Sequence, residues 1–140
     1  MVAVPTTLTF RHTHNYADQS GSGITIPIGL SVGAKSVRLL AKLDTGASNC
    51  IFQREYGEQL GLVLEDGEYR TFQTATSTFE TYGHNVTISS FEWHFDSIVY
   101  FSRDRAFSRN VLGRNGWLQQ FRLALVDYDS LLHLSHYNQL

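Results

Sequence analysis

The chain of 140 residues contains one short polar loop, Asp44-Thr45-Gly46-Ala47-Ser48, between two segments of strand character. Apolar side chains alternate with other residues through positions 37–43, directly before the loop, and apolar residues resume at 51–52. Aliphatic residues also alternate strictly with other residues through positions 24–32. Pro27 within this segment favours a strand at a sheet edge or with a bulge. A period of two buries one face of a strand. The loop is therefore predicted to join two half-buried strands.

Composition favours one β-rich domain. Apolar residues make up 42% and charged residues 17% of the chain, which is typical of a globular protein of this length. Aromatic residues reach 13%, and 11 glycines outnumber two prolines, as expected for strands joined by tight turns. The other elements that we expect are a possible strand at 7–11, a helix at 53–60, a hairpin with strands at 69–73 and 79–82, strands at 91–95 and 98–101, a charged loop at 103–110, a short helix at 116–120 and a final strand at 121–128.

Charge and hydropathy exclude several classes of partner. The formal net charge is -2 and no run of Lys or Arg stands out, so we expect neither a nucleic-acid nor an anionic-membrane partner. No apolar stretch has the length of a membrane span, and the start lacks the pattern of a signal peptide. Cys50 is the only cysteine, so no internal disulfide can form. A soluble, cytoplasmic protein is the expectation.

Three motifs occur in a fixed order along the chain. The first is Leu43 followed by the Asp44-Thr45-Gly46-Ala47-Ser48 loop, the second is the helix-like segment 54–62, and the third is Val111-Leu112-Gly113-Arg114-Asn115. An isolated Asp-Thr-Gly is a common turn former, but the ordered combination is much more specific. In this order the motifs resemble the retropepsin-like aspartic proteases. The resemblance implies an all-β, closed barrel-like acid protease fold with one or two short helices.

The resemblance also implies a domain division and a mechanism. Residues 24–128 would be the protease domain, residues 1–23 an N-terminal extension and residues 129–140 a C-terminal tail. The family hydrolyses peptide bonds with a water molecule held between two carboxylates that share a proton. Because the motif occurs once, two copies of Asp44 would have to meet on the two-fold axis of a homodimer. The expected activity is therefore that of an aspartic endopeptidase without a cofactor or metal, acting on a peptide or protein substrate.

Individual roles follow from the resemblance. Asp44, Thr45 and Gly46 would form the catalytic loop, with Thr45 bonding across the two-fold axis. Gly113 would pack on that loop, and Arg114 and Asn115 would serve the dimer architecture. The hairpin 68–83 would be a flap over the substrate. The residues expected to contact substrate are Ala47, Ser48, Thr76 and Ser77, with Leu43, Phe72 and Phe79 as candidate pocket walls.

The chain departs from the viral members of the family at two places. Ser48 stands where those enzymes carry an acidic partner for the Arg of the third motif, so Arg114 must find another acceptor. The flap tip is polar and rich in Thr, whereas theirs is hydrophobic. These departures leave open an alternative, a catalytically silent retropepsin-like module that dimerises or binds peptides.

Other residues have simpler interpretations. Asp44 alone could be a structural turn residue. His12 and His14 could share one face of a strand and hold a metal, but no nearby carboxylate or thiolate completes a site, so a solvated loop is favoured. Cys50 is interpreted as a small core residue rather than a nucleophile, because no local His would activate it. No metal site is predicted.

Overall fold

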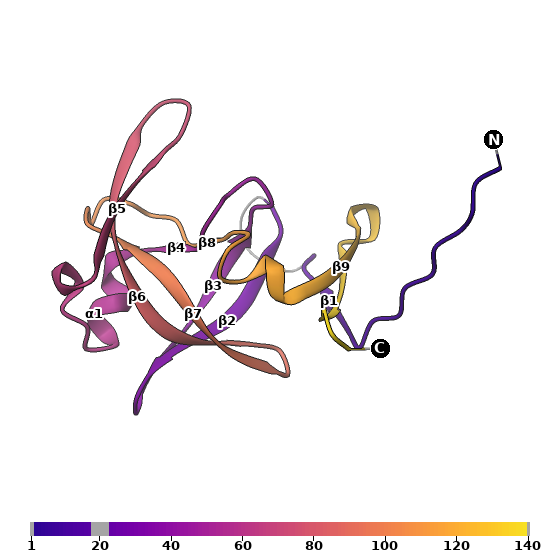
Figure 1. The fold of residues 1–140 in the computed structure, drawn as a ribbon, viewed down its shortest axis with the longest axis horizontal. Coiled ribbons are helices and arrows are strands. Elements are labelled where there is room, and N and C mark those ends of the chain that lie inside the picture. The colour runs from indigo at the N-terminus through magenta and orange to yellow at the C-terminus, as the bar shows by residue number, and fades with distance from the viewer. Residues whose placement is uncertain (1, 18–22, 140) are drawn as a thin grey trace.

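The protein is described here by a computed structural model, which describes residues 2–17 and 23–139 (Figure 1). The described chain contains two sheets. The larger sheet has seven strands, which in spatial order are β2 (Thr25–Val32), β3 (Lys35–Leu43), β8 (Val111–Leu112), β4 (Ile51–Phe52), β7 (Trp93–Ser102), β6 (Thr78–Ser90) and β5 (Glu68–Gln73).

The larger sheet closes on itself. Strand β2 pairs with β3 along its whole length and also pairs with β6 between Gly29 and Ser31. Pro27 lies outside the β2–β6 ladder, where its missing N–H costs no hydrogen bond. The ring of strands confirms the prediction of an all-β, closed barrel-like fold with few helices.

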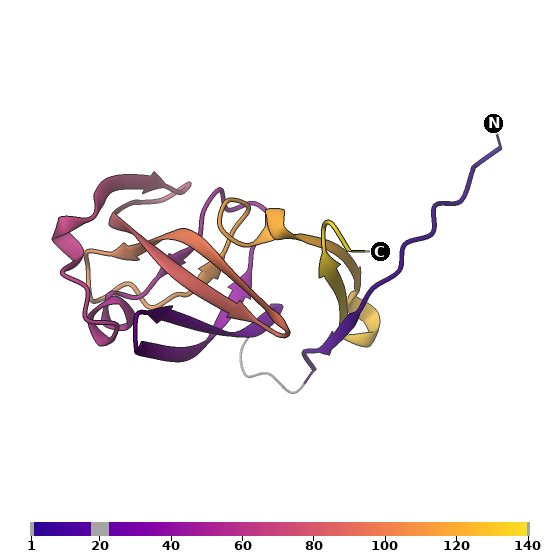
Figure 2. The ribbon, with the colours of Figure 1, turned by 60° about the horizontal axis from the view of Figure 1, so that its bottom comes forward.

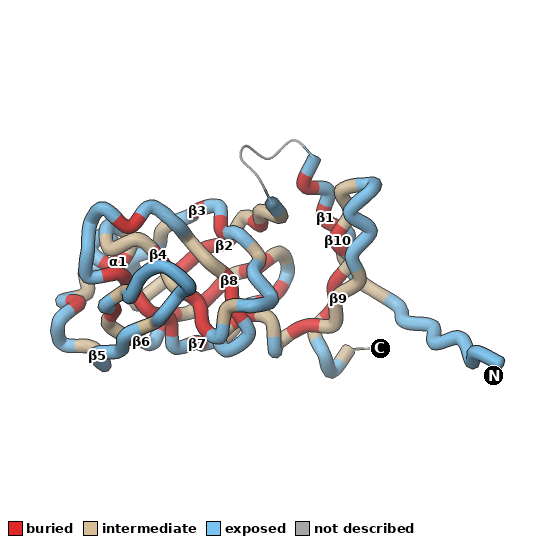
Figure 3. The backbone as a smooth tube through the Cα atoms, turned by 90° about the horizontal axis from the view of Figure 1, so that it is seen from above, coloured by how far each residue is buried: buried red, intermediate tan, exposed pale blue. Residues whose placement is uncertain are grey.

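The predicted alternation supplies the core. Ile26, Ile28 and Leu30 are at most 1% exposed, and the buried backbone of the barrel strands is visible in Figure 3. Trp117 is fully buried, donates its indole N–H to Ser90 Oγ at 3.1 Å, and packs on Phe121 with ring centroids 4.6 Å apart. The indole therefore joins the segment after the third motif to the end of β6.

The helices are short. Helix α1 (Arg54–Gln59) lies where a helix was predicted, and Gly61 follows it with a φ of 79°, as a C-terminal glycine cap requires. The helix expected at 116–120 is a 3-10 turn instead, η2 (Leu118–Gln120). Two further 3-10 turns are η1 (Leu64–Asp66) and η3 (Asp127–Asp129).

A second, three-stranded sheet joins the two ends of the chain, and Figure 2 shows it beside the barrel. Its order is β1 (His12–Asn15), β10 (Leu131–His136) and β9 (Phe121–Val126). The strand expected at 7–11 is wrong, since β1 begins at His12, and the strand expected at 121–128 ends at Val126. The division into segments 1–23, 24–128 and 129–140 stays a prediction, although strands from all three share this sheet. Residues 1, 18–22 and 140 of those segments lie outside the described residues.

Strand β1 packs on the turn between β6 and β7. Phe91 of that turn lies 4.2 Å from the ring of His12 and 5.3 Å from the ring of His14. His14 is buried and its Nε2 lies 2.8 Å from the carbonyl oxygen of Thr25. The interpretation of this segment as a solvated loop is therefore wrong. Within residues 2–17 and 23–139, no three metal-binding side chains come together.

The Tyr16 side chain links the segment after β1 to η3 by a hydrogen bond. Its hydroxyl donates a hydrogen bond to Asp127 Oδ1. Burial first, and this hydrogen bond second, raise the pKa of Tyr16 to about 12. A raised tyrosine pKa stabilises the fold fully below the unfolded-state value of about 10, and this contribution is lost as the pH rises through 12.

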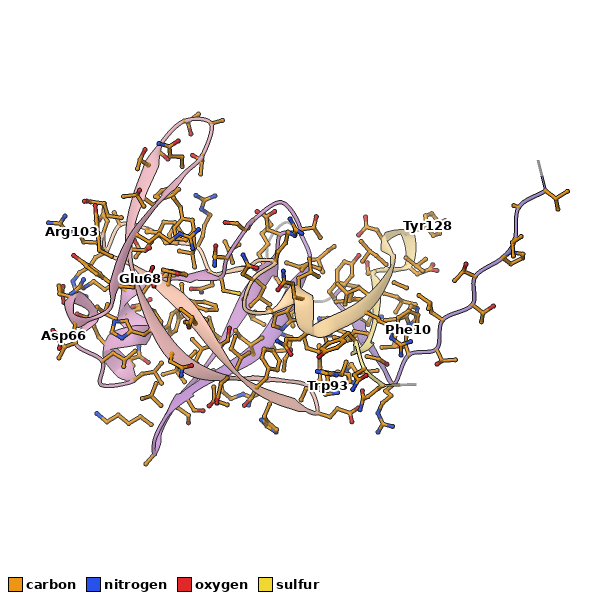
Figure 4. All side chains as sticks on the ribbon, in the orientation of Figure 1. Phe10, Asp66, Glu68, Trp93, Arg103 and Tyr128 are labelled. Carbon is orange, nitrogen blue, oxygen red and sulfur yellow. The ribbon has the colours of Figure 1, made fainter. Side chains whose placement is uncertain are left out.

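Replacing Tyr16 with Phe should therefore lower the free energy of unfolding by about 1 kcal/mol at neutral pH. The difference from wild type should shrink between pH 10 and pH 12, where the wild-type hydroxyl titrates. Urea unfolding across this pH range measures both quantities. Tyr128→Phe is the control, because Tyr128 is 98% exposed at the turn between β9 and β10 (Figure 4). Equal stability of wild type and Tyr16→Phe at neutral pH would contradict the prediction.

None of the helices among the described residues has the length and apolar character needed to cross a membrane.

Candidate active site

The loop after β3 presents the Asp44 carboxylate at the surface. Asp44 N donates to the carbonyl oxygen of Leu112 at 3.0 Å, which fixes where β3 ends. Within the loop, Gly46 N donates to Asp44 Oδ1 at 2.9 Å and Ala47 N donates to Asp44 O at 3.1 Å. The backbone N–H of Gly46 thus orients one carboxylate oxygen of Asp44. The Asp44 side chain is exposed in the isolated chain.

The third motif binds the loop along its backbone. Strand β8 runs parallel to β3, pairing Leu112 with Leu43. Arg114 N then donates to Ala47 O at 2.9 Å, and Asn115 N donates to Ser48 O at 2.8 Å. Two segments far apart in sequence are therefore joined by successive hydrogen bonds, which hold the loop in one geometry.

Gly113 lies at the closest approach of the two segments. A Cβ at this position would come within 2.3 Å of Asn49 O and 2.8 Å of Ala47 O. Both neighbours are backbone atoms that cannot rotate away. Only glycine therefore allows the third motif to pack this closely on the loop.

A cavity of about 260 Å³ opens beside Asp44. The β5–β6 hairpin, which lines one side of it, projects from the barrel as the predicted flap would (Figure 1). The lining combines three phenylalanines and two aliphatic side chains with residues of the Asp44 loop and with polar side chains. Its residues are Asp44, Gly46, Ala47, Ser48, Asn49, Ile51, Phe72, Gln73, Thr74, Phe79, Phe107, Arg109 and Val111.

The cavity contains some of the residues expected to touch substrate and not others. Ala47, Ser48, Phe72 and Phe79 line it, whereas Leu43 lines an adjoining hollow. Thr45 belongs to neither lining and is exposed.

The hairpin tip reaches the cavity only through Thr74. Thr76 and Ser77 are exposed and do not line it. The tip is closed on itself, because Thr74 N donates to Ser77 O at 2.8 Å and Ser77 N donates to Thr74 Oγ1 at 3.1 Å. A role for Thr76 and Ser77 in binding substrate therefore requires the hairpin to move toward Asp44.

Two lining residues come from the segment expected only to be a charged loop. Phe107 is 8% exposed and packs edge-on against Phe79 with centroids 5.1 Å apart. Arg109 follows two residues later. The signal in the sequence is Phe107 itself, a large aromatic residue among charged and small neighbours.

Arg114 is exposed, and its guanidinium makes no ion pair or hydrogen bond within the part of the chain that the structure describes. Ser48, at the position that is acidic in the viral enzymes, accepts from the Asn115 backbone. The acceptor that Arg114 was expected to find is thus absent from the described part of a single chain.

Cys50 lies directly behind the loop and is fully buried. Burial raises the pKa of the Cys50 thiol to about 12, so at neutral pH it is protonated and a poor nucleophile. Cys50→Ala should leave any cleavage activity within about twofold of wild type while costing about 1 kcal/mol of stability. Comparing cleavage rates with thiol labelling of the native protein checks this. Rapid labelling, or loss of activity in a folded variant, would contradict it.

Comparison with known proteins identifies the family. A family model described as aspartyl protease matches residues 29–115, which span both the Asp44 loop and the Gly113-Arg114-Asn115 motif. The chain belongs to the aspartyl protease family. No curated protein gave a match.

Solved structures agree with this family. A retropepsin-like aspartic protease from Rickettsia conorii is 19% identical with a TM-score of 0.63, and the match covers 89% of this chain and 99% of that one. The EIAV protease, solved in complex with the inhibitor HBY-793, is 18% identical with a TM-score of 0.52, covering 69% of this chain and 86% of that one. At these identities the likeness is one of fold, and it confirms the retropepsin-like fold of this aspartyl protease family member.

Proposed function

We propose that the protein is an aspartic endopeptidase that works as a homodimer with one active site. The observation that carries the proposal is the Asp44 loop, which presents an exposed carboxylate beside an apolar cavity under a hairpin. The loop is held by the Gly113-Arg114-Asn115 segment in a single geometry. A single chain supplies one such carboxylate, and a second copy brought to a two-fold axis supplies the other.

The chemistry follows from two carboxyl groups that share one proton. The ionised Asp44 takes a proton from water as the water oxygen bonds to the scissile carbonyl carbon. The protonated Asp44 of the other chain donates its proton to the carbonyl oxygen, which stabilises the tetrahedral intermediate. In the second step the carboxyl group that took the water proton gives it to the amide nitrogen and the C–N bond breaks. The other carboxylate takes a proton from a hydroxyl of the intermediate, which leaves a carboxylic acid and restores the shared proton. No metal or organic cofactor takes part.

The remaining residues would support these steps. Thr45, exposed beside Asp44, would hydrogen-bond across the axis and hold the two loops together. Ala47 and Ser48 line the cavity and would contact the substrate. Thr76 and Ser77 would reach the substrate when the hairpin closes and excludes water. Arg114, Asn115 and Gly113 would set the geometry of the dimer, with the Arg114 acceptor supplied by the partner.

Cleavage of an undirected peptide mixture between pH 4 and pH 7 tests the proposal. Product masses report the cleavage, Asp44→Asn protein is the matched control, and light scattering on the same samples gives the molar mass. Cleavage by a wild-type dimer that is absent from the control supports the enzyme. A folded dimer that binds peptides without cleaving them would favour the silent module instead. A folded monomer without activity would exclude the homodimer under those conditions.

Localisation in the cytoplasm remains part of the proposal. The sole cysteine, Cys50, is free and buried, which is compatible with a reducing compartment.

A further inference from the structure

One cationic side chain stands in the wall of the cavity beside Asp44. Of the residues that line this cavity, Arg109 alone carries a positive charge and Asp44 alone carries a carboxylate. The rest of the wall is uncharged and includes Phe72, Phe79 and Val111. Arg109 is exposed, so its guanidinium is accessible to a molecule bound in the cavity.

Two aromatic rings position the Arg109 guanidinium. Its central carbon lies 5.4 Å from the ring centroid of Phe79 and 5.4 Å from that of Phe107. The two rings pack edge-on, and Phe107 is buried. Cation–π contacts of this kind favour one placement of the side chain. Less rotamer freedom is then lost when the guanidinium binds an anion.

No carboxylate neutralises this charge within residues 2–17 and 23–139. Four other arginines form the ion pairs of the described chain, with glutamates 58, 65, 80 and 92 as acceptors. Arg109 takes part in none of them. The hollow on the other side of Asp44 is lined by Arg109 and Lys42, and again Asp44 is its only carboxylate. The surroundings of Asp44 are therefore cationic, in a chain whose formal net charge is -2.

We propose that Arg109 selects substrates with an acidic side chain within a few residues of the scissile bond. This inference rests on the proposed function, because it places a peptide beside Asp44. A planar guanidinium donates two parallel N–H hydrogen bonds to a carboxylate, and the two flanking rings favour one placement of the guanidinium. In a symmetric dimer the same wall occurs on both sides of the bond, so an acidic residue is favoured on either side.

Capped peptides that differ only in Glu or Gln test the selection. Each of the three positions on either side of a cleaved bond is varied in turn, and both termini are blocked so that side chains supply the only carboxylate. Wild-type kcat/KM should favour Glu by roughly tenfold at one or more positions. In Arg109→Gln the Glu-to-Gln ratio should fall to about one.

Arg103→Gln is the matched control. Arg103 lies in the same segment, pairs with Glu80 at 3.1 Å and does not line the cavity beside Asp44 (Figure 4). Its Glu-to-Gln ratio should equal that of wild type. A wild-type ratio near one, or a preference that survives in Arg109→Gln, would overturn the role of Arg109 while cleavage itself still supports the protease.

A binding measurement keeps the two proposals separate if no peptide is cleaved. Fluorescent Glu and Gln peptides are titrated with Asp44→Asn protein and with the Asp44→Asn/Arg109→Gln double variant, and anisotropy gives the Kd. Tighter binding of the Glu peptide that disappears in the double variant supports Arg109, even where the protease proposal has failed. Equal Kd values for the two peptides, or no binding of either, overturn it.

Discussion

Asp44→Asn should lower kcat/KM by roughly a thousandfold or more while leaving the fold intact. An amide does not ionise, so it neither takes the proton from water nor shares one with its partner. The side chain has nearly the same shape and is exposed, and an amide oxygen still accepts from Gly46 N as Asp44 Oδ1 does. Cleavage rates, circular dichroism and molar mass on matched samples measure the effect. Loss of activity through unfolding would appear in the spectrum.

Mixing the two proteins tests whether both carboxylates come from different chains. After subunit exchange at equal concentrations, only the dimers with two copies of Asp44 cleave, so about a quarter of the activity of an all-wild-type sample remains. Mixing wild type with Cys50→Ala should instead give the mean of the activities of the two separate samples. A decrease to one half in the Asp44→Asn mixture would mean that each chain works independently, and the shared dyad would be wrong.

Gly113→Ala should lower the free energy of unfolding by about 3 kcal/mol or more and abolish cleavage at temperatures where the variant is still folded. The new methyl group would meet Asn49 O at 2.3 Å and Ala47 O at 2.8 Å, and both belong to the backbone of the Asp44 loop. Relief of this overlap requires the loop to separate from residues 113–115. That separation breaks the Arg114–Ala47 and Asn115–Ser48 hydrogen bonds. Urea unfolding and peptide cleavage measure the two losses.

Gly29→Ala provides the control for the Gly113 prediction. Gly29 also lies within the barrel, but a Cβ there would meet its nearest neighbour, Ser89 Cβ, at 3.5 Å, an ordinary contact. Its stability should stay within about 1 kcal/mol of wild type, because alanine loses less backbone entropy than glycine on folding. Equal effects of the two substitutions would show that the close packing of Gly113 is not what holds the loop.

The barrel strands could be predicted where apolar residues alternate along a continuous segment of the sequence. Residues 24–32 alternate strictly because one set of side chains of β2 is buried, and Ile26 and Ile28 confirm this buried set. The terminal sheet was not predictable, because His12 pairs with Leu134 across almost the whole chain. Without its partner, β1 is a short polar segment that looks like a loop. Burial of His14 comes from Phe91, on a turn that local patterns do not connect to it.

In the candidate site too, sequence motifs indicate some residues and only three-dimensional contacts indicate others. Asp44 and Gly113 could be proposed as site residues from the sequence, because each lies in one of three motifs that occur in order along the chain. Phe107 and Arg109 were missed because their importance lies in contacts with Phe79, on the hairpin. A charged segment has no periodicity to show that one arginine is held by rings while another, Arg103, pairs with Glu80. Such a distinction depends on three-dimensional placement alone.

The backbone bonds between the loop and residues 112–115 also bear on when the site can exist during synthesis. A ribosome releases Asp44 long before Leu112, Arg114 and Asn115, whose backbone groups define the loop. Closing so long a segment is entropically costly and slow compared with forming a hairpin. A nascent chain therefore carries its acidic loop without these backbone hydrogen bonds until residues 112–115 have emerged. The fold itself delays the assembly of the candidate site until residues 112–115 have left the ribosome.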